Sequence, residues 1–310
     1  MNVLTYIEPD VSFPWFDEVS EPGENKSPCK IYNDGGHYIA SLISSVKNKK
    51  IERPKRLKMR VDELFDELYL KGVKQNLKKD DLVSYIKAGL ESGFPAYLSL
   101  DAFVSDSLSR KHLNLRSRIK RFRRKAALNR WNYFVTITYD DKKHNSKTFK
   151  EKLKKCLSNF HSRRAWKYMG VFEEAPETGR LHFHAIMYIP EGQIPGAMEN
   201  RTDYNKKKRK VQKVIVNTFF EKQFGRNDFR VLNDAELRCG NTMSYLLKYL
   251  EKTGERIVYS RGIPTEIEKD IDLENDVVCE MLDFVVKYIL FDDVIDYKRD
   301  ILKCVRQDSA

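Results

Sequence analysis

The chain has 310 residues, 41% of them hydrophobic, which predicts one large or two modest domains with a buried core. Its 57 basic and 45 acidic residues give a net charge of +12, which favours an anionic partner, with nucleic acid the leading candidate. Five widely spaced cysteines without a Cys-x-x-Cys pair argue against a disulfide framework, and no signal peptide or bilayer-spanning apolar run of about 20 residues is found. We therefore expect a cytosolic protein with no membrane association.

Residues 1–105 are expected to form an accessory region of unassigned role. Several prolines and Gly35-Gly36 argue against long regular elements before Tyr38, and residues 37–46 fit either a strand or a helix. Helical periodicity then predicts two helices. The first covers residues 61–72 and stops at Gly72, and the second covers residues 80–93, is capped by Asp80 or Asp81 and ends at Gly93.

Residues 110–130 contain ten basic residues and no acid. A solvated helix face is the alternative explanation, but uncompensated like charges repel one another, so a polyanion partner accounts for the tract better. The predicted DNA-binding residues are Arg116, Arg118, Lys120, Arg121, Arg123, Arg124 and Lys125.

The next part of the chain alternates strands and helices. A β-branched run predicts a buried strand over residues 131–141, and an apolar stripe predicts a helix over residues 147–164. A hairpin of two strands, residues 167–174 and 180–189, follows. The remaining predicted elements are a polar loop at 191–210, a helix at 211–225, a short strand at 229–232 and a helix from about residue 242.

The C-terminal residues 265–310 change the sign of the charge. Eleven acids and two lysines lie between Glu266 and Asp296. Within this stretch, the apolar residues 277–295 are predicted to form a helix that packs on something else.

Two of the six histidines, His182 and His184, flank Phe183 in an apolar strand. Alternate residues of a strand share a face, so both rings can bind one metal ion. Two ligands are too few, and Glu173 or Glu174 on the neighbouring strand can supply a third. Such a set suits Mg²⁺ or Mn²⁺, with zinc as an alternative.

Two tyrosines and two lysines repeat with a spacing of four in the sequence YLLKYLEK. Tyr245 and Tyr249 lie one helical turn apart, and Lys248 and Lys252 place an ammonium group beside each phenol. Aromatic residues at this spacing more often belong to a core. A neighbouring cation, however, stabilises a phenolate and binds phosphate, as a nucleophile for phosphodiester cleavage requires.

These patterns together resemble the HUH endonuclease superfamily of rolling-circle replication initiators, most closely the replication proteins of microvirus-type single-stranded DNA phages. The matching motifs are FVTITYD (134–140), His182-Phe183-His184 and YLLKYLEK (245–252), and the SRGIP stretch at 260–264 is also similar. The resemblance covers roughly residues 130–264 and implies Glu174, eight residues before His182, as the third metal ligand.

The resemblance implies an α+β fold. A central antiparallel sheet of about five strands would carry the histidines on a central strand and helices on its faces, with additional mostly helical N- and C-terminal segments. The endonuclease domain with its basic tract would span residues 106–264.

The implied activity is nicking and rejoining of single-stranded origin DNA through a 5′-phosphotyrosine, in the cytoplasm of a bacterial host that supplies a helicase and a DNA polymerase. The alternatives are a plasmid relaxase or transposase of the same superfamily, or a non-catalytic DNA-binding protein. Relaxases usually carry three histidines in the metal motif, and such transposases usually carry one tyrosine.

Overall fold

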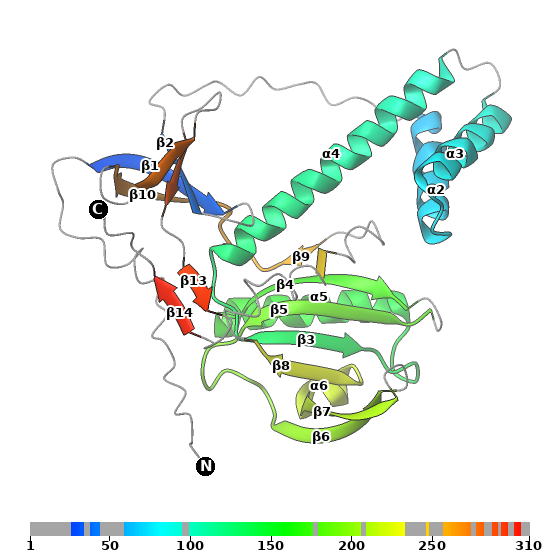
Figure 1. Cartoon of the computed structure of the whole chain (residues 1–310). Helices are drawn as coiled ribbons and strands as arrows, with labels where there is room; N and C mark the ends of the chain where they lie inside the picture. Colours follow the sequence, from blue (N-terminus) through cyan, green and yellow to red (C-terminus); the bar gives the residue numbers. More distant parts are fainter. Residues whose placement is uncertain are drawn as a thin grey trace. The chain divides into compact units, whose positions relative to one another are not determined.

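The structure is a computed structural model (Figure 1). It describes residues 26–33, 38–43, 59–94, 99–175, 179–205, 209–232, 246–247, 257–273, 277–281, 287–290, 293–296 and 301–304. Contacts divide the chain into two units. One contains the N- and C-terminal strands with residues 123–128, and the other contains residues 49–122 and 129–263. The predicted domain boundaries at residues 105 and 264 stay a prediction.

The larger unit is built on a five-stranded antiparallel sheet with strand order β8-β3-β5-β4-β9. Its strands are β3 (Tyr133–Thr138), β4 (Lys167–Glu174), β5 (Leu181–Tyr188), β8 (Asn227–Val231) and β9 (Val258–Tyr259). Strand β5, which carries both histidines, occupies the centre. The predicted α+β fold with a mainly antiparallel sheet is confirmed.

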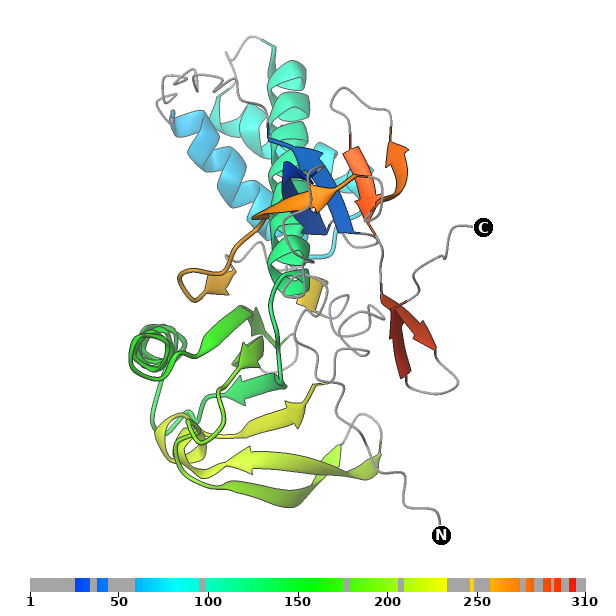
Figure 2. The same cartoon turned by 90° about the vertical axis from the view of Figure 1, so that its left-hand side faces the viewer.

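One face of this sheet forms the main hydrophobic core. Helix α5 (Ser146–Arg164) and the short α6 (Thr218–Gln223) contribute apolar side chains to it, including the fully buried Phe149 and Phe220. Phe172 of β4 and Phe183 of β5 meet them from the sheet. Figure 2 shows α5 end-on against this face. The opposite face of β3, β5 and β4 is therefore available for polar residues.

Next to β8, two strands form a separate antiparallel ribbon, β6 (Met198–Asn205) and β7 (Lys210–Asn217). The predicted loop at 191–210 and the helical start of 211–225 are therefore wrong. Val211, Val214, Ile215 and Val216 are β-branched, which favours a strand, and the helix begins only at Thr218. Asn217 caps that helix by accepting a hydrogen bond from the Phe220 N–H at 3.1 Å.

Three helices precede the sheet: α2 (Arg60–Lys74), α3 (Lys79–Gly93) and α4 (Leu100–Ala127). The two predicted N-terminal helices are present with shifted ends. Helix α3 begins at Lys79, and its N-cap is Lys78, not either predicted aspartate. Gly72 lies inside α2 and does not end it, because a Cβ atom there would collide with Leu82 of α3. The glycine thus serves close helix packing.

The smaller unit contains a second five-stranded sheet with strand order β10-β1-β2-β12-β11. Its strands are β1 (Lys26–Asn33), β2 (Tyr38–Leu42), β10 (Ile267–Asp272), β11 (Val277–Met281) and β12 (Lys287–Leu290), and a hairpin of β13 (Asp293–Asp296) and β14 (Ile301–Cys304) follows. Two expectations are corrected here. An eight-residue strand precedes Tyr38, and the described part of the acidic C-terminal region is made of strands, not helix.

The N- and C-terminal strands stabilise each other across the sequence. Strand β1 pairs with β10 from Lys26↔Asp272 to Ile31↔Ile267, and β2 pairs with β12. Ladders this far apart in sequence supply hydrogen bonds that local periodicity does not reveal. Among the described residues, no helix combines the length and apolar character needed to cross a membrane.

Candidate functional site

The polar face of the central sheet brings together the two histidines of β5, two threonines of β3 and one glutamate of β4. In the antiparallel ladder, His182 lies opposite Thr138 on one side and Glu173 on the other. His184 lies opposite Thr136. Residues directly opposite one another point to the same face, so all five side chains share it.

The threonine hydroxyls fix both imidazole rings through their Nδ1 atoms. The Oγ1 atom of Thr138 lies 2.7 Å from His182 Nδ1, and that of Thr136 lies 3.1 Å from His184 Nδ1. A hydrogen bond at Nδ1 orients the ring and leaves Nε2 as the outward-facing nitrogen, as in metal-binding histidines. The sequence analysis noted these threonines in FVTITYD but gave them no role, although their spacing of two matches that of the histidines.

Glu173, not Glu174, shares the histidine face. Its Oε2 atom lies 3.1 Å from His184 Nε2, and its side chain is 16% exposed. Glu174 lies opposite the core residue Leu181, and its side chain is 58% exposed. The prediction that Glu174 faces the histidines is therefore wrong by one residue. Spacing along the chain does not determine the register of a hairpin, and a shift of one residue moves a side chain to the other face.

Burial controls the charge state of the site. Burial, followed by the neighbouring His184, lowers the pKa of His182 below its ordinary value, so this ring is neutral at neutral pH and keeps a lone pair for a ligand. Asp228 of β8 lies opposite Thr136 on the same face, and burial raises the pKa of its carboxyl group. The Ile215 N–H opposes that shift by donating to Asp228 Oδ1 at 3.2 Å.

The histidine face opens into a cavity of about 630 Å³. Its walls are the threonines, histidines and Glu173, the segment Arg226–Asp228, and residues of the β6–β7 ribbon such as Arg201 and Gln212. Acids on the ribbon side are paired. Arg201 binds Glu199 and Glu221, each at 2.6 Å, and Arg226 binds Asp203. The ribbon and β8 contributions were not identified from the sequence, because the ribbon residues had been assigned to a loop and a helix.

The donor set at the histidine face fits a divalent metal ion. Two ligands with metal bonds of about 2.1 Å at right angles lie about 3.0 Å apart, close to the 3.1 Å between Glu173 Oε2 and His184 Nε2. The two imidazole centroids are 6.0 Å apart. In the part of the chain that the structure describes, no three His, Cys, Asp or Glu side chains converge closely enough to form a finished metal site. The metal site stays a prediction.

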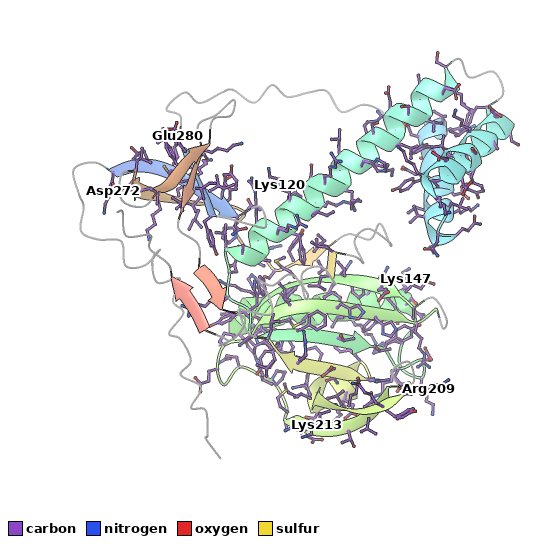
Figure 3. All side chains as sticks on the ribbon, viewed as in Figure 1. Lys120, Lys147, Arg209, Lys213, Asp272 and Glu280 are labelled. Atoms are coloured by element: carbon purple, nitrogen blue, oxygen red, sulfur yellow. The ribbon has the colours of Figure 1, made fainter. Side chains whose placement is uncertain are left out.

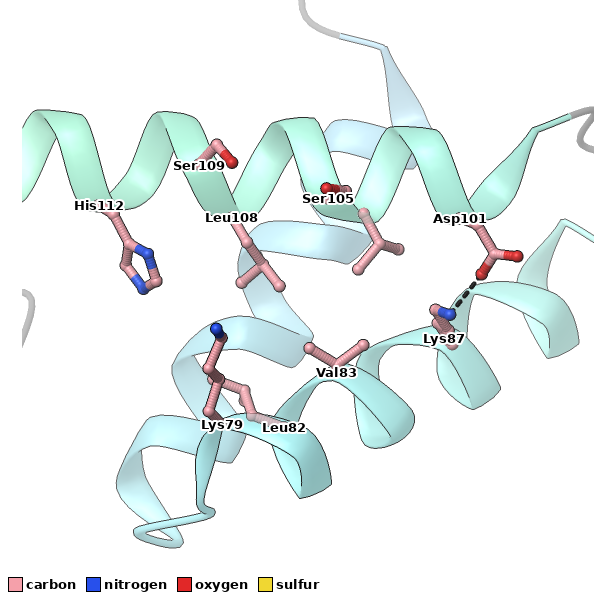
Figure 4. Close-up of a pocket in the computed structure, with 10 residues that line it drawn as sticks. Lys79, Leu82, Val83, Lys87, Asp101, Ser105, Leu108, Ser109 and His112 are labelled. Carbon is pink, nitrogen blue, oxygen red and sulfur yellow. Dashed lines mark ion pairs between the residues drawn. The ribbon is translucent and has the colours of Figure 1, made fainter.

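A second cavity, of about 360 Å³, lies between α3 and α4 and shares no residue with the first (Figure 4). Apolar side chains such as Leu82 and Leu108 line it together with Lys79 and His112. Its one carboxylate, Asp101, forms an ion pair with Lys87. A single histidine and a neutralised acid do not provide the ligands for phosphodiester chemistry, so this cavity is not the candidate active site.

The predicted DNA-binding residues lie on the second half of α4, and they are not equivalent. Arg116, Lys120, Arg121 and Arg123 are exposed. The guanidinium of Arg124, by contrast, stacks on the ring of Tyr32 at 3.7 Å. The exposed residues are the better candidates for contact with phosphate, and Figure 3 labels Lys120 among them.

The predicted nucleophile motif lies mostly outside the described residues. This applies to Tyr245, Tyr249, Lys248 and Lys252. The two described residues of the motif, Leu246 and Leu247, are helical and buried. After the motif, the Ser260 N–H donates to the Tyr168 carbonyl at 2.9 Å, and the Tyr168 N–H donates to Ser260 Oγ at 3.2 Å. The SRGIP stretch thus holds the chain against the edge of β4.

Comparison with known proteins places the site in a family. Residues 132–254 match the family model of the ORF2-type replication-associated proteins. The match spans both histidines, Glu173 and the tyrosine motif, and it covers about two-fifths of the chain. No curated protein and no solved structure gives a significant match. The predicted resemblance to replication proteins is confirmed, and the closer likeness to microvirus-type phages stays a prediction.

The geometry of this replication-associated segment makes Glu173 the carboxylate to test. We expect Glu173→Ala to weaken Mn²⁺ binding at least roughly tenfold in isothermal titration calorimetry, because the variant loses the glutamate that faces His184. Glu174→Ala is the matched control and should leave the Mn²⁺ affinity within about twofold. Weaker Mn²⁺ binding by Glu174→Ala alone would contradict the observed register.

Proposed function

We propose that this chain is a rolling-circle replication initiator that nicks and rejoins single-stranded origin DNA. The observation that carries the proposal is the histidine face. Two oriented imidazoles and a carboxylate line one cavity in a segment that matches a replication-associated family. A divalent cation, Mg²⁺ or Mn²⁺, held there would withdraw charge from the scissile phosphate.

The residues of the cavity have separable roles in this proposal. His182, His184 and Glu173 hold the cation. Thr136 and Thr138 act as positioning residues, because their hydroxyls fix the imidazole tautomer in which Nε2 carries the free lone pair.

The nucleophile is proposed to be a phenolate from the motif YLLKYLEK. Its Oη atom attacks the scissile phosphorus, the bond from phosphorus to the 3′-oxygen breaks, and that oxygen leaves with the electron pair and takes up a proton. The products are a 5′-phosphotyrosine and a free 3′-hydroxyl, which a host polymerase extends while a host helicase separates the strands. Attack by a 3′-hydroxyl reverses the step and rejoins the DNA without ATP, because the number of phosphodiester bonds is conserved.

Burial of the two leucines supports a role for the tyrosines at the cavity and not in the core. On a helical wheel, Leu246 and Leu247 lie opposite the face shared by positions 245, 248, 249 and 252. The leucines are 0% and 6% exposed. Lysines 248 and 252 would lower the phenol pKa and bind the phosphate.

Loss of the histidines should separate chemistry from binding. We expect the double variant His182→Ala/His184→Ala to nick single-stranded origin DNA roughly a thousandfold more slowly, since metal polarisation supplies several kcal/mol. Affinity for the DNA should stay within about threefold, because distributed phosphate contacts supply it. His112→Ala, an exposed histidine on α4, is the control. Unchanged nicking by the double variant would exclude the metal mechanism and favour a non-catalytic DNA-binding protein.

Either tyrosine is proposed to act as nucleophile, in alternate rounds. Each single variant, Tyr245→Phe or Tyr249→Phe, should still form a covalent adduct with a short oligonucleotide, and the double variant should form none. Denaturing gels detect the adduct, and peptide mapping should find DNA on both residues. If one single variant is inactive while the other completes rounds normally, one tyrosine suffices and the alternation is wrong.

Helix α4 is proposed to contact the DNA backbone. Replacing Arg116, Lys120, Arg121 and Arg123 by Gln should weaken binding to all single-stranded sequences alike and reduce the salt-dependence slope by up to about 3, or roughly 0.7 for each lost contact. The control removes four exposed lysines that are not on α4: Lys142, Lys147, Lys152 and Lys155. Equal effects of both sets would mean that the tract is an ordinary charged surface.

A further inference from the structure

The β6–β7 ribbon has two faces of different chemistry. Cross-strand pairing runs from Met198↔Asn217 to Asn205↔Lys210, so successive pairs alternate between the faces. One face carries Arg201, Asp203 and Gln212 and lines the histidine cavity. We call the other the outer face. Along its exposed length it is formed by the pairs Asn200↔Ile215, Thr202↔Lys213 and Tyr204↔Val211.

Charge is sorted between these faces. The acids of the ribbon, Glu199 and Asp203, belong to the cavity face and are bound by arginines. The six residues of the outer face include Lys213 and no acid. Arg209 and Lys210 add two exposed positive charges at the turn end of the ribbon, as Figure 3 shows for Arg209. The outer face and the turn end therefore present positive charge to solvent.

The outer face also exposes apolar surface beside hydrogen-bonding groups. Tyr204 and Val211, directly opposite each other near the turn, are 54% and 65% exposed. Asn200 and Thr202 are exposed on the same face. A polar surface that only keeps a ribbon soluble needs no such apolar pair. Amide and hydroxyl groups next to apolar groups are what protein side chains use to contact base edges and thymine methyl groups.

The dimensions of the ribbon select the form of DNA. Two strands about 4.8 Å apart, with their side chains, fit the major groove of B-DNA, which is about 12 Å wide and admits a two-stranded ribbon. The three outer-face pairs span about 14 Å at 3.4 Å per residue, or roughly four base pairs. A single strand would instead be held by several stacking aromatics, and this face has one.

We propose that the outer face of the β6–β7 ribbon binds double-stranded DNA in its major groove, next to the cavity that receives the single strand. The proposal rests on the proposed function for its biological setting. It would place duplex DNA flanking the nick site on one side of the ribbon and the scissile strand on the other. The turn-end cations Arg209 and Lys210, with Lys213, would contact phosphates, and the outer-face pairs would contact bases.

The test measures binding to a mixed-sequence duplex of about 30 base pairs and to a single strand of about 20 nucleotides over a range of salt. Arg209→Ala/Lys213→Ala should bind the duplex roughly tenfold more weakly, with a salt slope lower by about 2. Tyr204→Ser/Val211→Ser should also weaken duplex binding, but leave the slope unchanged. Single-strand binding should stay within about twofold for both. Lys147→Ala/Lys152→Ala on α5 removes the same charge as a control.

Three outcomes would overturn the proposal. They are an equal loss with the α5 control, an equal loss for single-stranded and duplex DNA, or a loss with the charge variant only, which would make the ribbon a general phosphate-binding patch. Thermal unfolding of each variant checks its folding. Because the readout is binding, it remains valid if the protein fails to nick DNA, and intact nicking by the ribbon variants would leave the proposed function standing if duplex binding were absent.

Discussion

The candidate site depends on the antiparallel register of β5 against its two neighbours. Pairing of His182 with Thr138 and Glu173 gathers the oriented ring, its hydrogen-bond partner and the carboxylate on one face. A slip of one residue would turn this set toward the core. Gly170 of β4 fixes the register on the core side, because a Cβ atom there would lie 2.7 Å from Ala185 Cβ and 2.5 Å from the Phe183 ring. Packing on one face thus determines chemistry on the other.

A central strand with a polar face is costly to bury unless each polar group has a partner. The His184 side chain is only 7% exposed, and it is bonded at both ring nitrogens, by Thr136 and by Glu173. The ribbon and β8 wall the same cavity and keep part of the solvent out, which strengthens electrostatic interactions inside it. The arrangement that satisfies these groups in the folded chain is therefore also one that holds a cation in a fixed position.

The sequence predicted the elements whose pattern is local and failed where pairing decides. The spacing of two between the histidines and the β-branched run at 133–138 were sufficient to predict β5 and β3 and their shared face. Glu173 could not be distinguished from Glu174, because the register of β4 is set by contacts such as that of Gly170. Residues 277–290 were predicted as one helix for the same kind of reason. Their apolar run fits both structures locally, and only the distant strand β2 provides the pairing for β12.

Strand alternation also explains how a cavity with several acids can accept a polyanion. Glu199, Glu221 and Asp203 are neutralised by Arg201 and Arg226, and burial raises the pKa of Asp228, which lowers its share of negative charge. Glu173 remains, next to imidazoles of which His182 is neutral. A phosphate entering the cavity would thus meet one principal negative charge, at the position where a divalent cation would be held. The cation would then both cancel that repulsion and provide the attraction, so binding of DNA at the cavity and binding of metal should support each other.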